Sequence, residues 1–191
     1  MVSLPPLATE ADVKEALGRD LTPDEQGRLD AVLSKASELF RAESGQQFTA
    51  GTSLSRLKVN GRRVWLPQSP ATGVLSVTTE AGEEVEPGRL HKQWLSVPLA
   101  SHEFVYVEYE HGGDVPDLVR LTVADVAAVV LSIDPAAARG VTQVSDTGGR
   151  YSRSETYAAW AQGGRARLAP DDVAVARRFR RRVPTVWVMR P

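Results

Sequence analysis

The residues with the strongest chemical character in this sequence are five arginines in a run of six, RRFRRR at 177–182. Arginine is always charged and carries several N–H donors, so such a cluster binds phosphates or carboxylates. On a helix these arginines would spread around most of the circumference, at about 100° per residue. The run has no Asn, Gln, Ser or Thr to reach base edges, which argues against sequence-specific DNA recognition. Non-specific contact with nucleic acid and docking on an acidic protein surface both stay open.

The segment after the arginines, VPTVWVMRP at 183–191, favours docking on a protein. Val186 and Val188 alternate with Trp187 and Met189, as in a short strand. Such a strand needs the edge of an existing sheet, which its own chain, a neighbouring copy or another protein could provide. Arginine beside tryptophan is also a common composition at interface hot spots.

The residue types that carry catalysis form no recognisable constellation. The chain has no cysteine, which excludes disulfides, thiol catalysis and cysteine-ligated metals. The motifs H-E-x-x-H, G-x-S-x-G, G-x-x-x-x-G-K-[ST] and G-x-G-x-x-G are absent. Ser101, His102 and Glu103 are adjacent, but neighbours on a strand point to opposite faces and cannot form a proton relay. His91 and His111 also lie in or beside the β-rich region, where histidines are usually solvated. We therefore predict no enzyme activity, no cofactor and no metal.

Charge is distributed unevenly along the 191 residues. Residues 1–149 hold 13 Lys and Arg against 21 Asp and Glu, whereas residues 150–191 hold 10 Arg against 3 acids. An acidic body with a basic end suggests a polar partner arrangement or a head-to-tail contact between copies. No apolar run is long enough to cross a membrane, and the N-terminus does not resemble a secretory signal. We expect a soluble protein made in the cytoplasm.

Two helices are predicted near the N-terminus. Thr9 can cap a short helix that stops at Gly18. Thr22 and Glu25 form a capping box for a second helix, with Pro23 at its first position and a stop at Gly45. Its buried face has helical spacing and comprises Leu29, Val32, Leu33, Ala36, Leu39 and Phe40.

The middle of the chain has the period-2 pattern of strands. LKVNGRRVWL predicts a hairpin that turns at Asn60-Gly61, and GVLSVTTEAGEEVE predicts another that turns near Gly82. WLSVPL and EFVYVEYE complete a small antiparallel β subdomain. In EFVYVEYE, one face consists of Val105, Val107 and Tyr109.

The last third of the chain predicts helices around a long connection. Pro116 can start a helix whose apolar stripe comprises Leu118, Leu121, Val126, Val129 and Val130. Residues 140–164 form a long polar connection of the kind that is usually functional or ordered by a partner. A last helix opens at 169 or 170, with acids at its start and arginines at its end, and stops at Pro184. The fold class is α+β: a core of about four helices (1–46 and 113–182), an inserted β subdomain (47–112) and an extended C-terminal arm (183–191).

Taken in order, several segments resemble one known family. The start LATEADVKEALGRDLTPDEQGRLDAVLSKASELFRAESGQQF is similar to the head-to-tail adaptor (connector) proteins of long-tailed double-stranded DNA bacteriophages, actinobacteriophage type. The β insertion from RRVWLPQSP to YVEYEHGGDVP, the segment VSDTGGRYSRSETYAA and the closing LAPDDVAVARRFRRR also resemble that family. The resemblance covers nearly the whole chain and rests on the order of the pieces, because none of them carries a catalytic signature.

The resemblance implies a structural protein of the virion neck. Typically twelve copies form a ring beneath the portal, extend the DNA channel without sequence-specific DNA binding, and provide the platform for the stopper and tail. The C-terminal segment of the family commonly reaches the portal. Carried onto this chain, the candidate portal-docking residues are Arg177, Arg178, Arg181, Arg182, Val186, Trp187, Val188 and Met189. Candidate contacts with a neighbouring copy or the stopper are Tyr151, Tyr157 and Trp160. The β insertion departs from the simplest relatives, which are nearly all helical.

Two other functions stay open at this point. One is a non-specific DNA-binding protein that uses the arginine run, which predicts salt-sensitive DNA affinity. The other is a different phage neck protein, such as a stopper or head-completion protein. Those are usually shorter and richer in strands, so the long capped helix at 23–44 argues against them.

Overall fold

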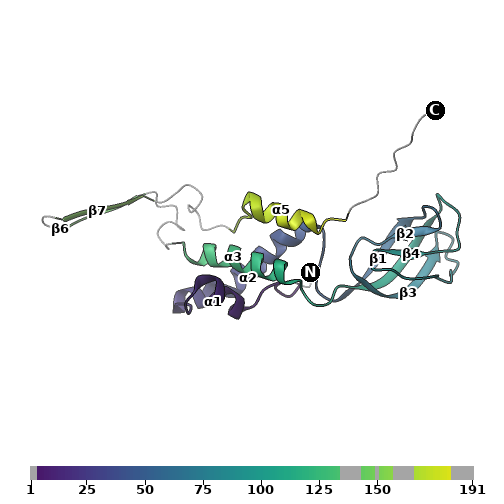
Figure 1. Cartoon of the computed structure of the whole chain (residues 1–191), viewed down its shortest axis with the longest axis horizontal. Helices are drawn as coiled ribbons and strands as arrows, with labels where there is room; N and C mark the ends of the chain where they lie inside the picture. The colour runs from purple at the N-terminus through teal and green to yellow at the C-terminus, as the bar shows by residue number, and fades with distance from the viewer. Residues whose placement is uncertain (1–3, 134–142, 149–150, 157–165, 182–191) are drawn as a thin grey trace, which may run out of the picture. The chain divides into compact units, whose positions relative to one another are not determined.

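The computed structural model describes residues 4–133, 143–148, 151–156 and 166–181 (Figure 1). Within these ranges the chain forms four α-helices and seven β-strands, which confirms the predicted α+β class. The chain divides into two compact units. The helical unit comprises residues 1–40 and 117–175, and the β unit comprises residues 41–116 and 176–191.

The first two helices begin where the capping signals predicted. Helix α1 spans Glu10–Leu17 after the Thr9 cap, and Gly18 ends it in the left-handed conformation at φ 66°. Helix α2 spans Pro23–Ser44, with Gly45 beyond it at φ 69°. The Thr22 backbone N–H donates to the Glu25 carboxylate at 2.8 Å, and the Glu25 N–H donates to the Thr22 hydroxyl at 3.3 Å. The predicted capping box is therefore confirmed.

Glu25 also predicts a pH-dependent contribution to stability. Its carboxylate accepts two bonds from the Arg19 guanidinium, at 2.7 and 2.8 Å. These bonds, with the Thr22 bond, lower the pKa of Glu25 from 4.5 to about 2. We expect Glu25→Gln to lower the free energy of unfolding by about 1–2 kcal/mol at pH 7, a modest value because Arg19 is half exposed.

The sign of the pH effect follows from the lowered pKa. The carboxylate stabilises the fold fully above pH 4.5, and its contribution is lost as the pH falls towards 2. Urea titrations at pH 7 and near pH 2 should therefore show a difference between wild type and Glu25→Gln that disappears at the lower pH. A difference that stays constant across this range would show that the ion pair is not its source. Glu15→Gln, on the exposed face of α1, is the matched control.

The helical unit is held together by contacts between α1, α2 and the third helix, α3, at Asp117–Leu131. The Arg120 guanidinium donates to the buried Asp12 carboxylate and so joins α3 to α1. Arg28 donates to the Leu131 carbonyl at 3.2 Å and joins α2 to the end of α3. Across the described residues, no helix is both long and apolar enough to cross a lipid bilayer.

The predicted apolar stripe of α3 is only partly correct. Val126 and Val130 are buried, but Leu118, Leu121 and Val129 are 44, 43 and 51% exposed. The sequence pattern failed because α3 is apolar on more than one side, so helical spacing alone did not identify the inward face. The core is filled instead by a set that also includes Val119, Val123, Ala124, Ala127 and Leu131.

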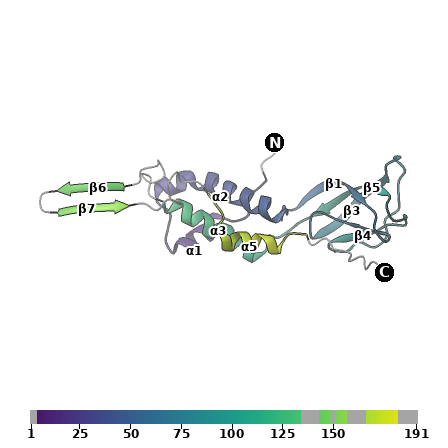
Figure 2. The same cartoon turned by 90° about the horizontal axis from the view of Figure 1, so that it is seen from above.

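Part of the predicted long connection is a hairpin. Strands β6 (Gln143–Gly148) and β7 (Tyr151–Thr156) pair antiparallel, with Gln143 opposite Thr156 and Gly148 opposite Tyr151 (Figure 2). The prediction of an irregular segment over 140–164 was therefore wrong for these twelve residues. QVSDTG and YSRSET lack an apolar face, so the period-2 signal of a half-buried strand is missing.

The β unit contains two small antiparallel sheets. Strands β1 (Gly51–Lys58), β5 (Phe104–His111) and β3 (Ala71–Thr79) form one sheet with β5 in the centre. Strands β2 (Arg63–Trp65) and β4 (Trp94–Ser96) form the other. One cluster of buried side chains serves both sheets: Val59, Val64, Leu66, Ala71, Val77, Val85, Leu95, Val97, Val105, Val107 and Tyr109.

The alternation of β5 is confirmed, whereas one predicted hairpin is not. Val105, Val107 and Tyr109 are fully buried on one face of β5. The turn after Asn60 exists, with Gly61 and Arg62 at φ 60° and 61°, as in a type I′ turn. However, β1 pairs with β5 and β2 pairs with β4, so the strands on either side of this turn enter different sheets. The turn near Gly82 is confirmed by the Thr79 N–H, which donates to the Glu83 carbonyl at 2.8 Å.

Candidate functional site

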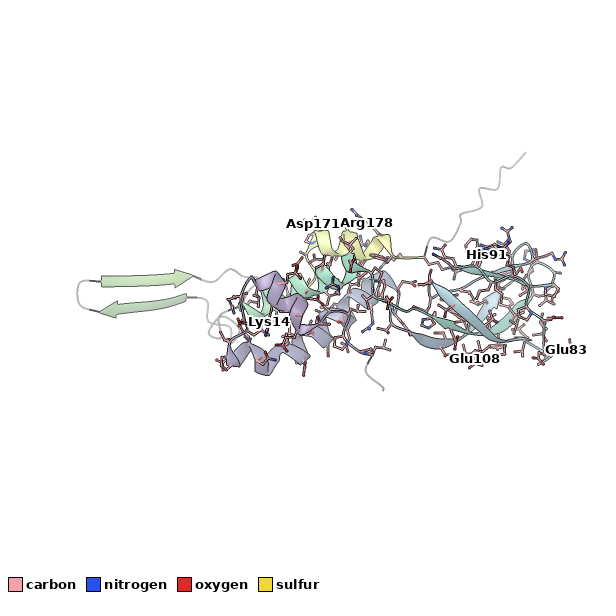
Figure 3. The ribbon with its side chains drawn as sticks, turned by 60° about the horizontal axis from the view of Figure 1, so that its bottom comes forward. Lys14, Glu83, His91, Glu108, Asp171 and Arg178 are labelled. Carbon is pink, nitrogen blue, oxygen red and sulfur yellow. The ribbon has the colours of Figure 1, made fainter. Side chains whose placement is uncertain are left out.

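The candidate site is built on the C-terminal end of helix α5, which spans Pro170–Arg178. Asp171 and Arg178 lie at opposite ends of this helix (Figure 3), so both charges match the helix dipole. The helix was predicted to continue to Pro184, but it ends at Arg178. The Phe179 and Arg180 N–H groups donate to carbonyls three residues back, at 3.1 and 3.2 Å, which tightens the chain into a turn.

Glu43 holds this end of α5 in the β unit. Its carboxylate accepts a 2.7 Å bond from Arg177 Nε and a 3.1 Å bond from Arg180 Nη2. Arg180 Nε also donates to the Glu43 carbonyl at 2.6 Å. The bond from Arg177 lowers the pKa of Glu43, so the carboxylate stays charged at neutral pH. Two of the arginines therefore have intramolecular partners.

An aromatic contact and two glutamines position the chain beneath α5. The Phe179 ring meets the Phe48 ring edge-to-face, with 5.4 Å between centroids. Gln46 is buried, and its amide donates to the Pro67 carbonyl at 2.9 Å and accepts from the Ser69 N–H at 2.8 Å. Gln68 accepts from the Gln47 N–H at 2.7 Å, and its own N–H donates to the Tyr109 hydroxyl at 3.0 Å. These bonds fix the linker after α2 against the loop at 66–70.

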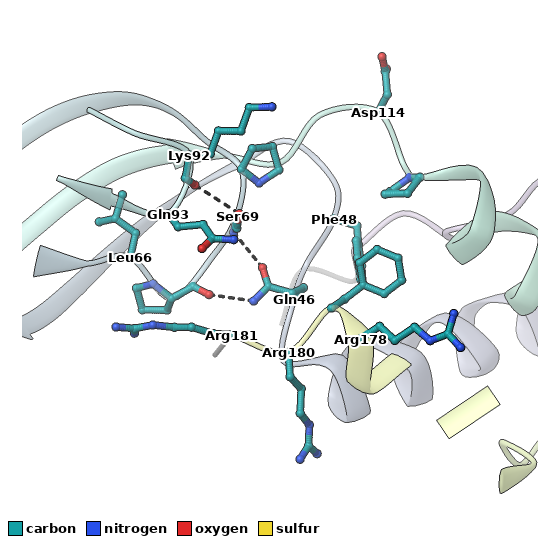
Figure 4. Close-up of a pocket in the computed structure, with 14 residues that line it drawn as sticks. Gln46, Phe48, Leu66, Ser69, Lys92, Gln93, Asp114, Arg178, Arg180 and Arg181 are labelled. Carbon is teal, nitrogen blue, oxygen red and sulfur yellow. Dashed lines mark hydrogen bonds between the residues drawn. The ribbon is translucent and has the colours of Figure 1, made fainter. Parts of the chain in front are cut away.

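A pocket of about 490 Å³ lies between these segments of the β unit (Figure 4). In Figure 4 the Arg178 and Arg180 side chains point away from Gln46, and Arg181 extends in the opposite direction to Arg178. Burial lowers the pKa of the Arg181 guanidinium, and the nearby Tyr109 hydroxyl opposes this change. The pocket is lined by Gln46, Phe48, Leu66, Pro67, Ser69, Pro70, Lys92, Gln93, Asp114, Pro116, Arg178, Phe179, Arg180 and Arg181.

The structure places three of the predicted docking arginines and separates their roles. Arg177 is bound to Glu43, whereas Arg178 and Arg181 are both exposed and both line the pocket. The other predicted docking residues, from Arg182 onward, lie outside the described residues, as do Tyr157 and Trp160. Tyr151 belongs to β7.

The histidines have ordinary surroundings. His111 is buried, its Nε2 lies 2.8 Å from the Ser53 hydroxyl, and burial lowers its pKa. His91 stacks on Trp94 with 3.7 Å between ring centroids. Within the described part of the chain, no group of three or more His, Asp or Glu side chains is arranged to hold a metal ion.

Comparisons with known proteins find similarity among solved structures and none among protein families. No protein-family model and no curated protein sequence matches the chain. Among solved structures, the chain is similar to one from "Neck of empty GTA particle computed with C6 symmetry". The similarity has a TM-score of 0.49 and 17% identity, and it covers 68% of this chain and 80% of the other.

Sequence reasoning missed the residues that orient the site. Glu43 lies in the last turn of α2, where it resembled any solvated helical acid, and its distance of 134 residues from Arg177 left no local signal. Gln46 and Phe48 lie between two predicted elements. The positive φ of Phe48, 64°, is unusual for an aromatic residue and has no sequence signature.

Proposed function

We propose that this chain is a structural neck protein of a phage-like particle, a head-to-tail adaptor whose copies form a ring beneath the portal. The observation that carries the proposal is the order of the elements. The sequence resemblance rests on one order of elements: two capped helices, a β insertion, a further helix and a last helix that ends in arginines. The described elements follow that order: α1, α2, β1–β5, α3, β6–β7 and α5.

In this proposal the end of α5 is the base of a portal-docking arm. Glu43 and Phe48 hold Arg177, Arg180 and Phe179, so the chain leaves the β unit from a fixed point. Arg178 and Arg181 are then the cations that meet acidic groups of the portal, and residues 183–191 add a strand or fill a groove there. Arg177 has a positioning role.

The uneven charge supports a channel function. In the proposed ring, the acidic part of the chain lines the channel, where it repels phosphates and lets double-stranded DNA pass without being held. The basic end faces the portal, and the opposite surface is the platform for the stopper. The copy number we propose is twelve, as the sequence resemblance implies.

Neighbouring arginines of α5 provide a matched test. We expect Arg178→Glu to weaken binding to the purified portal protein at least tenfold, about 1.4 kcal/mol, because it reverses an exposed interface charge. Arg177→Gln should change portal binding by less than about twofold, because Arg180 still binds Glu43. Biolayer interferometry of both variants at a fixed salt concentration measures the difference.

The same two variants test the competing DNA-binding function. If the arginines serve nucleic acid, Arg178→Glu should lose salt-sensitive affinity for double-stranded DNA and keep its affinity for the portal. Equal portal binding by Arg178→Glu and wild type would refute the docking role of α5. With Arg177 and Arg180 bound to Glu43, fewer arginines of this run are free to contact phosphates.

A further inference from the structure

The outer face of α3 has an unusual composition for a solvent-exposed helix. Leu121, Asp125 and Val129 lie four residues apart on one face, and Leu118 extends the row. We call these four residues the α3 ridge; its three apolar members are 43–51% exposed. Among the described residues of the helical unit, Leu4 is the only other large apolar side chain that is exposed. An aligned row of this kind is typical of a surface that another protein covers.

Asp125 limits what can cover the ridge. Asp125 lines a groove of about 510 Å³ between α3 and the start of α5. Other residues that line this groove include Val126, Val129, Val130, Ile133, Leu168 and Pro170. Burial and the nearby Asp172 both raise the pKa of Asp125. Arg167 also lines this groove, but no cation is bonded to Asp125 among the described residues. A covering surface should therefore bring a positive charge, and two α3 ridges packed on each other would place like charges together.

Helix α2 carries a row that complements the ridge. Gly27, Ala31 and Lys35 are exposed and also lie four residues apart; we call them the α2 row. Apart from its chain neighbours and the backbone of its own helix, no atom lies within 4 Å of the position that a Gly27 Cβ would take, so large side chains can approach there. The Lys35 ammonium is 3.5 Å from Glu38, and both side chains are more than half exposed, so this ion pair is weak and Lys35 can take another partner. Asp30 is one position from Ala31 and therefore about 100° off the row.

We infer that the α3 ridge of one copy packs against the α2 row of a second copy. Rows of i, i+4 spacing on both helices interdigitate in the commonest class of helix packing. Asp125 then lies opposite Ala31, within reach of the Lys35 ammonium one turn along α2, and a leucine or valine of the ridge fills the space above Gly27. The contact is heterologous, because each copy uses a different surface on either side, so it repeats from copy to copy and can close a ring. The inference rests on the proposed function for the ring and specifies its subunit contact.

The absence of native cysteine allows a direct test by disulfide cross-linking. A chain with both Ala31→Cys and Asp125→Cys should give a ladder of covalent dimers, trimers and higher species when oxidised at about 1 mM, where contacts of millimolar affinity are populated. Each single variant alone should stay monomeric, because its cysteine has no partner. A mixture of the two single variants should give dimers and nothing larger. Both positions are exposed, so circular dichroism should show an unchanged fold.

Two outcomes would overturn the inference. The double variant could give no covalent species, or Asp125→Cys alone could give dimers, which would mean that two α3 ridges pair symmetrically.

Charge exchange is the second readout: Asp125→Lys should weaken self-association at least tenfold in sedimentation, and adding Lys35→Asp should restore it. These results are independent of portal binding by Arg178, so a failed ladder with intact portal binding would remove the subunit contact and leave the neck function standing.

Discussion

Gly112→Ala is expected to destabilise the β unit by about 3 kcal/mol or more. Gly112 has φ 78°, which costs an alanine about 1–2 kcal/mol. An added Cβ would also lie 2.2 Å from the Thr49 carbonyl oxygen and 2.8 Å from that of Phe48. Neither backbone can retreat easily, because the Gly112 N–H donates to the Pro70 carbonyl and the Gly113 N–H donates to the Phe48 carbonyl. Overpacking of this kind adds about 1–3 kcal/mol.

The neighbouring glycine separates the two causes. Gly113 also has a positive φ, 146°, but apart from its chain neighbours no atom lies within 4 Å of its Cβ position. Thermal denaturation should therefore show a loss for Gly113→Ala from backbone strain alone and a larger loss for Gly112→Ala, with a decrease in Tm of about 10 °C or more. Equal losses would contradict the close approach of Gly112 to Thr49. Because Phe48 packs on Phe179, Gly112→Ala should also loosen the end of α5.

Deletion of residues 183–191 is expected to abolish portal binding while the monomer stays folded. These nine residues contain the alternating apolar side chains of the proposed arm, including Trp187. An interface that depends on a few such anchors loses most of its affinity when they are removed, by about 100-fold or more. The contacts of Glu43 with Arg177 and Arg180 do not involve the deleted residues, so the Tm should change little.

A substitution that keeps the chain length is the control for this deletion. Trp187→Ala should lower portal affinity by about 30-fold, as for an aromatic hot spot, whereas Thr185→Ala should have almost no effect. Calorimetric titration of the portal protein with each variant measures these changes. Wild-type affinity after the deletion would refute the docking arm. A parallel loss in Thr185→Ala and Trp187→Ala would indicate that chain length or conformation matters more than the aromatic anchor.

The elements that were predicted correctly have local causes. Thr9, Thr22 and Glu25 satisfy backbone N–H groups within three residues, so the starts of α1 and α2 are readable from the sequence. The alternation of Val105 and Val107 likewise identifies the buried face of β5, because alternate side chains of a strand point to the same side of the sheet. In each case the signal that predicts the structure lies in residues that are close together in the chain.

The predictions that failed depend on partners far away in the sequence. The turn at Gly61 could be predicted, but the pairing of β1 with β5 brings together residues about fifty positions apart. The end of α5 at Arg178 is stabilised by Glu43, which no pattern around the arginines indicates. The exposure of Leu118, Leu121 and Val129 has a different cause, because a second molecule in our proposal buries them. If the proposal holds, the predicted apolar stripe of α3 is buried in the assembly, although three of its side chains are exposed in the single chain.

Electron microscopy of particles from a phage that lacks this gene tests the central proposal most directly. The adaptor function predicts separate heads and complete, unattached tails, with joined particles restored when the gene is supplied from a plasmid. Heads that have also lost their DNA would add a role in retaining the genome. Normal joined virions in the absence of the gene would contradict the neck function and return the arginine run to the DNA-binding alternative.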